Sequence, residues 1–174
     1  MSYARFFAEG RHTGRVLRFG ESVSVDQIHP AEYFSLNRER VEAGLFAGID
    51  PELSEAIRPG DIVVAGKNFG CGSSREVYAQ AMAWKGIAAV VAVSVARIFF
   101  RNMVNYGILV LDGQDAAVHA LANGDDATID LQAGIICSQQ GAVPIANPPG
   151  EEVQRMLREN SARIERVGCG TTST

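Results

Sequence analysis

The stretch DIVVAGKNFGCGSSREVYAQAMAWKGIAAVVAVSVARIFFRNMVNYGILVL, residues 61–111, decides the fold. Three short apolar runs rich in β-branched residues alternate in it with two longer segments of helical spacing. The apolar runs, which are typical of strands buried on both faces, are residues 61–65, 87–93 and 108–111. The helical segments, each followed by a glycine, are residues 73–85 and 94–106. This order predicts a β-α-β-α-β unit of parallel strands, with ligands favoured at the carboxyl ends of the strands.

The flanking segments add shorter elements around this unit. Residues 14–28 alternate apolar and polar positions and are interrupted by Gly20, which predicts two short strands joined by a turn. Residues 30–40 are expected to form a loop excursion, and Ser94 is expected to cap the second helix of the central unit. The remaining predicted elements are a short helix at 52–57, a hairpin with strands at 128–131 and 135–138, and a final helix at 151–159.

The composition is that of a folded globular protein. Of the 174 residues, 47% are hydrophobic and 21% are charged, which is far from the composition of disordered chains. The chain is long enough to bury a core and shows no internal repeat, so a single domain over residues 1–174 is expected. Residues 1–13 and 168–174 are expected to be flexible.

Charge and hydropathy argue against several kinds of partner. The net charge of -4 comes without a basic run, so no nucleic-acid partner is expected. The longest apolar stretch, residues 87–96, is too short to cross a bilayer, and the first ten residues lack the order of a secretory signal. The sequence therefore predicts no membrane partner and a cytoplasmic location.

The cysteines give no sign of a disulfide framework or a metal site. Cys71, Cys137 and Cys169 are odd in number and widely spaced, which suits a reducing compartment. The three histidines are also isolated, so no local ligand set for zinc or an iron–sulfur cluster is present. Any metal that the chemistry requires is expected to come from another chain, and Cys71 is interpreted as a small buried thiol.

The most informative segment is GKNFGCGSSRE, residues 66–76, which leads from a predicted strand into a predicted helix. A Walker loop needs Gly-Lys-Ser/Thr at the helix end, whereas here Gly72 is followed by Ser73, Ser74 and Arg75. The Rossmann fingerprint needs a small residue where Arg75 stands. A nucleotide site is therefore disfavoured.

The same residues fit a site for a small carboxylate. A helix amino terminus offers N–H groups and partial positive charge, and Arg75 adds a guanidinium fork suited to a carboxylate. Gly72 allows close approach to the main chain, and Ser73 and Ser74 place hydroxyls where the ligand would lie. The pattern Ser73-x-x-Glu76 is also a capping box, which would start a helix in any protein, and both interpretations can hold together.

This segment, followed by ARIFFRN at 96–102 and by Tyr106-Gly107, closely resembles the signature of aconitase-family swivelling domains. The similarity is greatest to the small subunits of isopropylmalate dehydratases, and it runs in the same order through VDQIHP, residues 25–30, to the final helix. The resemblance implies an α/β fold, an aconitase-type swivelling β/β/α domain in which hairpin strands are added to the central parallel unit.

The resemblance also implies roles for individual residues. Ser73 would be the catalytic base that removes a carbon-bound proton, and Asp26 would be a catalytic acidic residue lining the same cleft. Arg75 would bind a substrate carboxylate, and Ser74 and Gly72 would complete the substrate contacts. A serine hydroxyl is a poor base in water, so a helix terminus and a cation would be needed to stabilise its anion.

Removal of the substrate hydroxyl needs a Lewis acid, and the resemblance implies a [4Fe-4S] cluster on a separate large subunit. This chain would then be a hydro-lyase small subunit, inactive alone and with no cofactor or metal of its own. Its substrate would be a 2-hydroxy dicarboxylate like 3-isopropylmalate, an intermediate of leucine biosynthesis. The alternatives are a related malate (dimethylmalate, citramalate or homoaconitate) or a non-catalytic, carboxylate-binding regulatory module.

The resemblance associates specificity with the loop that begins at Tyr33. Homoaconitase relatives tend to place an arginine in this loop to meet an extra carboxylate, whereas Ser35 and its neighbour Phe34 favour a branched malate. Two alternatives stay open. Arg38 is close enough in sequence to supply that charge. The apolar side chains of the loop would also be explained as anchors on the core, and these are Tyr33, Phe34 and Leu36.

Some positions depart from the family pattern. Val77 stands where the family has a histidine, and Ser24-Val25-Asp26 replaces Asp-Thr-Asp. These departures leave the reaction class intact but loosen the link to leucine biosynthesis. His29 is interpreted as a local hydrogen-bonding residue rather than a catalyst.

Overall fold

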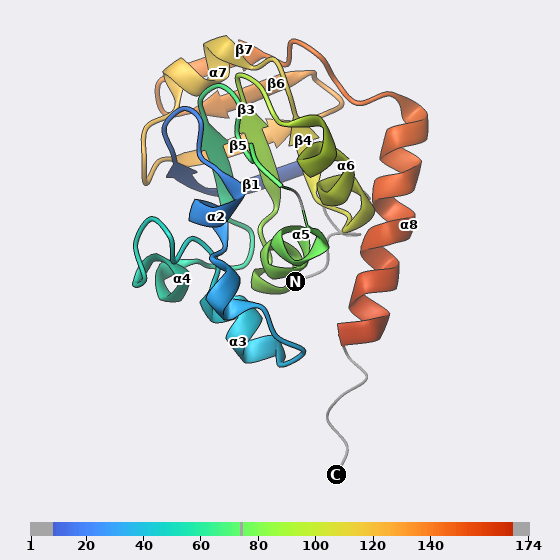
Figure 1. Ribbon diagram of the computed structural model, residues 1–174. Helices are drawn as coiled ribbons and strands as arrows, with labels where there is room; N and C mark the ends of the chain where they lie inside the picture. The colour runs from blue at the N-terminus through green and yellow to red at the C-terminus, as the bar shows by residue number, and fades with distance from the viewer. Residues whose placement is uncertain (1–8, 74, 169–174) are drawn as a thin grey trace.

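The computed structural model of the protein describes residues 9–73 and 75–168, with side chains as far as residue 164. A seven-stranded sheet with the order β4-β3-β2-β1-β5-β6-β7 runs through it (Figure 1). The strands are β1 (Arg11–Arg18), β2 (Ile62–Ala65), β3 (Ala89–Ala92), β4 (Leu109–Leu111), β5 (Asp126–Asp130), β6 (Ile135–Ser138) and β7 (Gly141–Pro144).

The sheet has a parallel half and an antiparallel half. β1 to β4 are parallel, and Ile62 pairs with Ala89, which in turn pairs with Leu109. β5 lies antiparallel to β1, and β5, β6 and β7 continue as antiparallel hairpins. The predicted β-α-β-α-β unit and the predicted hairpin are both confirmed, whereas β7 was not predicted.

Helices surround this sheet. They are α2 (Val25–Ile28), α3 (Arg38–Ala43), α4 (Leu53–Ala56), α5 (Glu76–Lys85), α6 (Arg97–Asn105), α7 (Asp115–Ala120) and α8 (Glu151–Gly168), with a 3-10 turn, η1, at Ala31–Tyr33. The two crossover helices, the helix near residue 53 and the final helix agree with the prediction. α3 and α7 were not predicted, because the first lies in the expected loop excursion and both are only six residues long.

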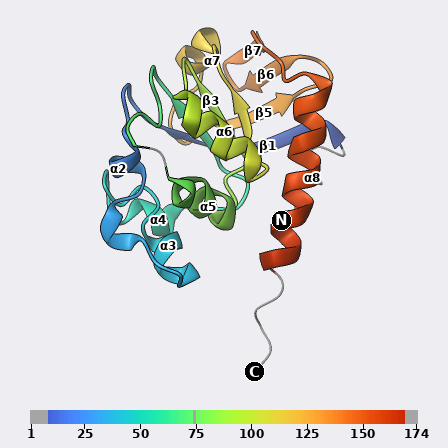
Figure 2. The same ribbon diagram turned by 45° about the vertical axis from the view of Figure 1, so that its right-hand side comes forward.

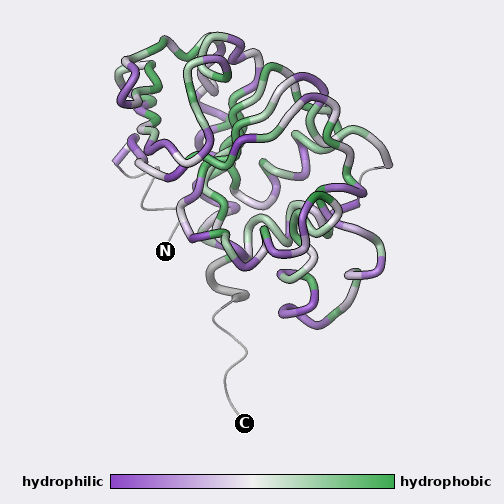
Figure 3. The backbone as a smooth tube through the Cα atoms, turned by 90° about the vertical axis from the view of Figure 1, so that its left-hand side faces the viewer, coloured by the Kyte–Doolittle hydropathy of each residue, from purple (hydrophilic) through white to green (hydrophobic). Residues whose placement is uncertain are grey.

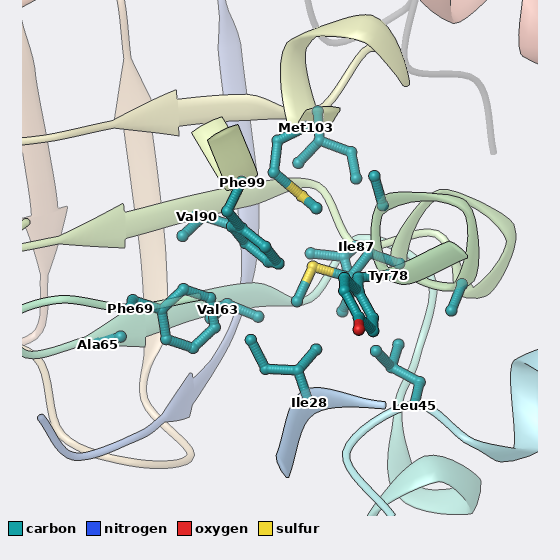
Figure 4. Packing of buried hydrophobic residues seen from close by; sticks show 14 of the residues in the cluster. Ile28, Leu45, Val63, Ala65, Phe69, Tyr78, Ile87, Val90, Phe99 and Met103 are labelled. Carbon is teal, nitrogen blue, oxygen red and sulfur yellow. The ribbon is translucent and has the colours of Figure 1, made fainter. Parts of the chain in front are cut away.

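Both faces of the parallel half are covered, because alternate residues of β2 belong to two hydrophobic clusters. Val63 and Ala65 pack in one cluster with residues of α5 and α6 (Figure 4). Ile62 and Val64 pack in the other with α7, with β5 and β6, and with Leu157 of α8. In Figure 3, hydrophobic stretches of the backbone run through the middle of the molecule. The uniformly apolar runs in the sequence are explained by this double coverage.

The segment after β1 differs from the prediction of a second strand. Residues 25–28 form the helical turn α2, because Ser24 and Gln27 make a capping box. The Gln27 N–H donates to the Ser24 hydroxyl at 3.3 Å, and the Ser24 N–H donates to the Gln27 side-chain oxygen at 3.0 Å. Val25 and Ile28, three residues apart, are both buried, so the expectation of a strand here was wrong.

The two ends of the chain are described only in part. Arg11 to Thr13, which were expected to be flexible, lie in β1 and pair with β5. Residues 1–8 and 169–174 of the expected flexible ends, like Ser74, lie outside the described residues. Within the described part of the chain, no helix combines the length and the apolar character needed to cross a membrane.

The long helix α8 packs against α6 along one side of the molecule (Figure 2). The Asn160 side chain donates to the main-chain oxygen of Val104 at 3.1 Å, near the end of α6. A Cβ atom on Gly107 would lie 2.7 Å from the main-chain nitrogen of Ser161. α8 therefore reinforces the helix whose amino end borders the predicted site.

We expect Leu157→Ala to destabilise the protein far more than Met156→Ala. Leu157 is 0% exposed and Met156 is 38% exposed on the same helix. The first substitution should lower the free energy of unfolding by about 2–5 kcal/mol, through lost burial and a cavity, and the second by about 0.5 kcal/mol or less. Urea denaturation of both variants measures this, and equal losses would contradict the packing of α8.

Candidate active site

The loop between β2 and α5 is hydrogen-bonded along both of its sides. Its neighbours are the segment after β1 and the segment after β3, so the loop continues the parallel sheet past the strand ends. The main-chain hydrogen bonds, all of 2.8–3.0 Å, join Gly70 N to Val23 O, Val25 N to Cys71 O, Phe69 N to Ser94 O and Ala96 N to Phe69 O. Residues 69–71 of the loop are therefore held in place by the neighbouring segments before any ligand binds.

Ser94, in the segment after β3, binds this loop instead of capping a helix. α6 begins at Arg97, after Ala96 and without a side-chain cap, so the predicted capping role of Ser94 was wrong. The Ser94 hydroxyl instead accepts the N–H of Asn68 at 2.8 Å. Asn68 has a left-handed backbone with φ of 58°, and this hydrogen bond helps to hold that turn.

The loop glycines have different functions. Gly70 is buried with φ of 74°, and a Cβ there would lie 2.3 Å from the Phe99 ring. Gly72 is exposed with φ of 112°, and a Cβ there would lie 3.0 Å from Val25. Gly70 thus allows the Phe99 ring to pack against the loop. Gly72 has no side chain to cover the main chain beside Ser73, as the predicted contact of Gly72 with substrate requires.

Ser73 is exposed and lies three residues before α5. The helix begins at Glu76 with Arg75 at its N-cap position and no side-chain cap, so the capping-box interpretation of Ser73 and Glu76 was wrong. The Glu76 carboxylate instead accepts a hydrogen bond of 2.6 Å from the hydroxyl of Tyr106, the residue at the carboxyl end of α6. Burial and this carboxylate raise the pKa of Tyr106, which therefore stays a proton donor.

Arg75 lies over the ring of Phe34, although the two residues are far apart in sequence. The guanidinium carbon is 5.1 Å from the ring centroid, within the range of a cation–π contact. Phe34 in turn stacks on His29, with centroids 5.6 Å apart and an interplanar angle of 25°. The predicted specificity residue Phe34 thus contacts the predicted carboxylate-binding residue.

Asp26 reaches the same region from the first turn of α2, where it is exposed. Its negative charge acts on the hydroxyl of Tyr78, whose pKa is raised by burial and by Asp26 and lowered by the positive charge of Arg75. The Tyr78 hydroxyl donates to the main-chain oxygen of Ser73 at 3.3 Å. Tyr78 is therefore bonded to Ser73 and is linked to Arg75 through the ring of Phe34. It lies in the helical segment 73–85, where the sequence pattern gave it no role in the site.

The remaining predicted residues lie at the edge of this group. Ser35 is exposed, and its hydroxyl accepts the N–H of Asn37 at 3.0 Å. Leu36 is fully exposed at 105%, so it does not anchor the loop. Ser74, a predicted substrate contact, lies outside the described residues.

Histidine and cysteine side chains in the described chain do not gather into a metal site. No group of three His, Cys, Asp or Glu residues able to hold a metal ion occurs within residues 9–73 and 75–164. His29 is fully buried, and its Nε2 bonds the main-chain oxygen of Val41 at 2.8 Å, which confirms its local hydrogen-bonding role. Burial lowers the pKa of His29, so the ring is neutral near pH 7. Cys71 and Cys137 are free and half-buried.

Most of this chain is similar in sequence to known proteins. Residues 50–116 match the Aconitase C-terminal domain. The homoaconitase small subunit of Thermus thermophilus is 39% identical over 137 residues, which are 78% of this chain and 83% of that protein. The 3-isopropylmalate dehydratase small subunit 2 of Methanopyrus kandleri is 42% identical over 142 residues, 80% of this chain and 83% of that protein. The chain belongs to the aconitase family. Within that family it is a small subunit of the isopropylmalate dehydratase and homoaconitase type.

A solved structure supports the assignment of this small subunit. The crystal structure of 3-isopropylmalate dehydratase from Methanocaldococcus jannaschii matches with a TM-score of 0.73 and 30% sequence identity. The match covers 92% of this chain and 99% of the crystallised chain. The aconitase-type α/β fold expected from the sequence is thereby confirmed.

We expect Gly70→Ala to destabilise this small subunit more than Gly134→Ala. Both glycines have positive φ, 74° and 68°, so both variants bear the cost of a left-handed alanine, about 1–2 kcal/mol. Only at Gly70 must the new methyl group displace the Phe99 ring, because nothing lies within 4 Å of a Cβ at Gly134. The additional loss should be about 1–3 kcal/mol by chemical denaturation. Equal losses would show that the loop is not packed as described.

Proposed function

We propose that this chain is the small subunit of a hydro-lyase that dehydrates and isomerises a substituted 2-hydroxy dicarboxylate similar to 3-isopropylmalate. It would work in the cytoplasm with a large subunit that carries a [4Fe-4S] cluster, and it would be inactive alone. The observation that carries the proposal is the exposed Ser73, which shares with Arg75 the end of the loop at the carboxyl end of β2, while Asp26 reaches the same region from α2.

The side chains of this loop suit proton removal from a bound carboxylic acid. Arg75 offers a fixed, bidentate partner for a substrate carboxylate. Ser73 would take the proton from the carbon next to that carboxylate. Its alkoxide would be stabilised by the amino terminus of α5 and by the charge of Arg75, both of which are present before the reaction begins.

Hydroxyl removal is the part of the reaction that would depend on a metal. The described residues offer no ligand group for a metal, so the donors for a cluster would lie on another chain. When bound to the large subunit, the cluster would supply the Lewis acid that accepts the departing oxygen.

Exposed apolar side chains on both sides of the loop support a covering partner. Leu36 follows Phe34 on one side, and Ile98, at 61% exposed, lies on the first turn of α6 on the other. Ile98 borders a hollow of about 910 Å³ that also reaches Gly70 and Gly72. A large subunit seated on these residues would close the site around Ser73 and exclude water.

The position of Arg38 supports a malate with an apolar substituent. The Arg38 Nε donates to Glu42 at 2.5 Å, and its guanidinium carbon lies 5.5 Å from the centroid of the Trp84 ring. Trp84 is near the end of α5, about 14 Å along the helix from Arg75 at 1.5 Å per residue. Arg38 is thus held away from the carboxylate site, whereas the apolar ring of Phe34 contacts Arg75 there.

We expect Ser73→Ala, assayed with the large subunit, to abolish turnover and to leave substrate binding largely intact. Loss of the base should lower kcat by about 10²- to 10⁴-fold, because the carboxylate contact of Arg75 is kept. Steady-state kinetics and calorimetric titration with the dicarboxylate measure the two effects. Ser138→Ala, on β6, is the control and should behave as wild type.

Normal turnover in Ser73→Ala would remove Ser73 from the base role. It would favour the second candidate function, a module that binds a carboxylate without catalysis.

We expect the reconstituted complex to act on 3-isopropylmalate or dimethylmalate in preference to homocitrate. Ser35 and Leu36 offer no cation for the extra carboxylate, and Arg38 is engaged elsewhere. Arg38→Ala should therefore leave the ratio of kcat/KM values among these substrates unchanged. Parallel assays of the four substrates, citramalate included, measure this. A selective loss of homocitrate turnover in the variant would instead assign the complex to the homoaconitase type.

A further inference from the structure

We propose that Tyr78 is a positioning residue that joins the proton-abstracting residue and the carboxylate-binding residue into one rigid unit. Its hydroxyl would hold the main chain at Ser73, and its ring would hold Phe34, on which Arg75 lies. The inference rests on the proposed function, because it assigns the two ends of this unit to proton removal and substrate binding.

The hydroxyl end of Tyr78 fixes the backbone of the loop. Tyr78 is in the first turn of α5 and donates to the main-chain oxygen of Ser73, five residues earlier, at 3.3 Å. This hydrogen bond joins the last part of the loop directly to the helix that follows it. Ser73 is thus fixed from the helix side, in addition to the main-chain hydrogen bonds that fix residues 69–71 from the sheet side.

The ring of Tyr78 belongs to a group of three aromatic side chains. The Phe34 and Tyr78 centroids are 5.9 Å apart with an interplanar angle of 59°, and the His29 and Tyr78 centroids are 6.3 Å apart. His29 also stacks on Phe34. Each ring therefore touches both others, and such pairs favour defined relative orientations.

This aromatic group stands on the hydrophobic core. Tyr78 is 2% exposed, and in Figure 4 its ring lies beside Ile28 and Leu45. His29 is fully buried and bonded to the main chain of Val41. The rings of Tyr78 and His29 cannot turn without disturbing the core. They therefore hold the Phe34 ring, whose face contacts the guanidinium of Arg75, in a fixed position.

The hydroxyl of Tyr78 is not needed for packing, since phenylalanine would fill the same space. A buried hydroxyl is costly unless it is hydrogen-bonded, and this one is bonded to the residue proposed to remove the proton. Burial and the charge of Asp26 raise the pKa of this hydroxyl, and the charge of Arg75 lowers it. The hydrogen bond would therefore set where the Ser73 side chain stands relative to the substrate bound at Arg75.

The test is Tyr78→Phe in the complex with the large subunit, assayed with substrate deuterated at the carbon that loses its proton. The variant keeps the ring but loses the hydroxyl, so kcat should fall by about 3- to 10-fold with KM changed less than about 2-fold. The primary deuterium isotope effect on kcat should rise, because proton removal becomes more rate-limiting. A mere loss of folded complex would lower kcat and leave the isotope effect unchanged.

Two further variants serve as a control and as a test of the Phe34 contact. Ser54→Ala, which removes another buried hydroxyl that donates to a main-chain oxygen, that of Glu42 at 2.7 Å, should leave kcat and the isotope effect unchanged. Phe34→Leu removes the surface beneath Arg75, so it should raise KM more than it lowers kcat. An unchanged isotope effect in Tyr78→Phe would overturn the inference.

Hydrogen exchange of the small subunit alone separates this inference from the proposed function. Tyr78→Phe should speed the exchange of amides in residues 72–76, and Ser54→Ala should not. If the wild-type complex proves inactive on every malate, the proposed function fails, and faster exchange in Tyr78→Phe still supports the contact with Ser73. Wild-type exchange in that variant would overturn the positioning role whatever the activity.

Discussion

The main-chain hydrogen bonds around residues 69–71 are the constraint on which the site depends. They extend the pairing of β2 past the end of the strand, between the segments that follow β1 and β3. The exposed loop consequently has the order of a sheet although it carries glycines at its turns. Ser73 follows this ordered stretch after Gly72 and is bonded through its main-chain oxygen to Tyr78, and Arg75 lies over the ring of Phe34, so both are placed by contacts within the protein.

The central fold could be predicted because its signals are local. The runs at 61–65, 87–93 and 108–111 are apolar throughout, since the strands that they form are covered on both faces. Gly86 and Gly107 take left-handed conformations where the helices end. The short α2 was missed because Val23 and Val25 mimic strand alternation, and only the capping pair of Ser24 and Gln27 shows otherwise.

The sequence could predict some residues of the site but not the contacts between them. Ser73, Arg75 and Asp26 follow from the loop and from the resemblance to known proteins, but their contacts depend on chain segments that meet only in the folded state. The position of Phe34 beneath Arg75 joins residues 41 positions apart in the sequence. Tyr78 occupies an ordinary apolar position of a helix, and no sequence pattern reveals that its hydroxyl returns to the loop.

The hydrogen bond between Tyr106 and Glu76 has an electrostatic consequence for the neighbouring arginine. A carboxylate directly after Arg75 would ordinarily compete for its guanidinium and cancel its field. The phenol of Tyr106 diverts this carboxylate, and the ion pairs of the described chain do not include one between Glu76 and Arg75. The guanidinium of Arg75 consequently retains its attraction for an incoming anion. Glu76 joins α5 to the end of α6 through this hydrogen bond instead of serving as a counter-ion.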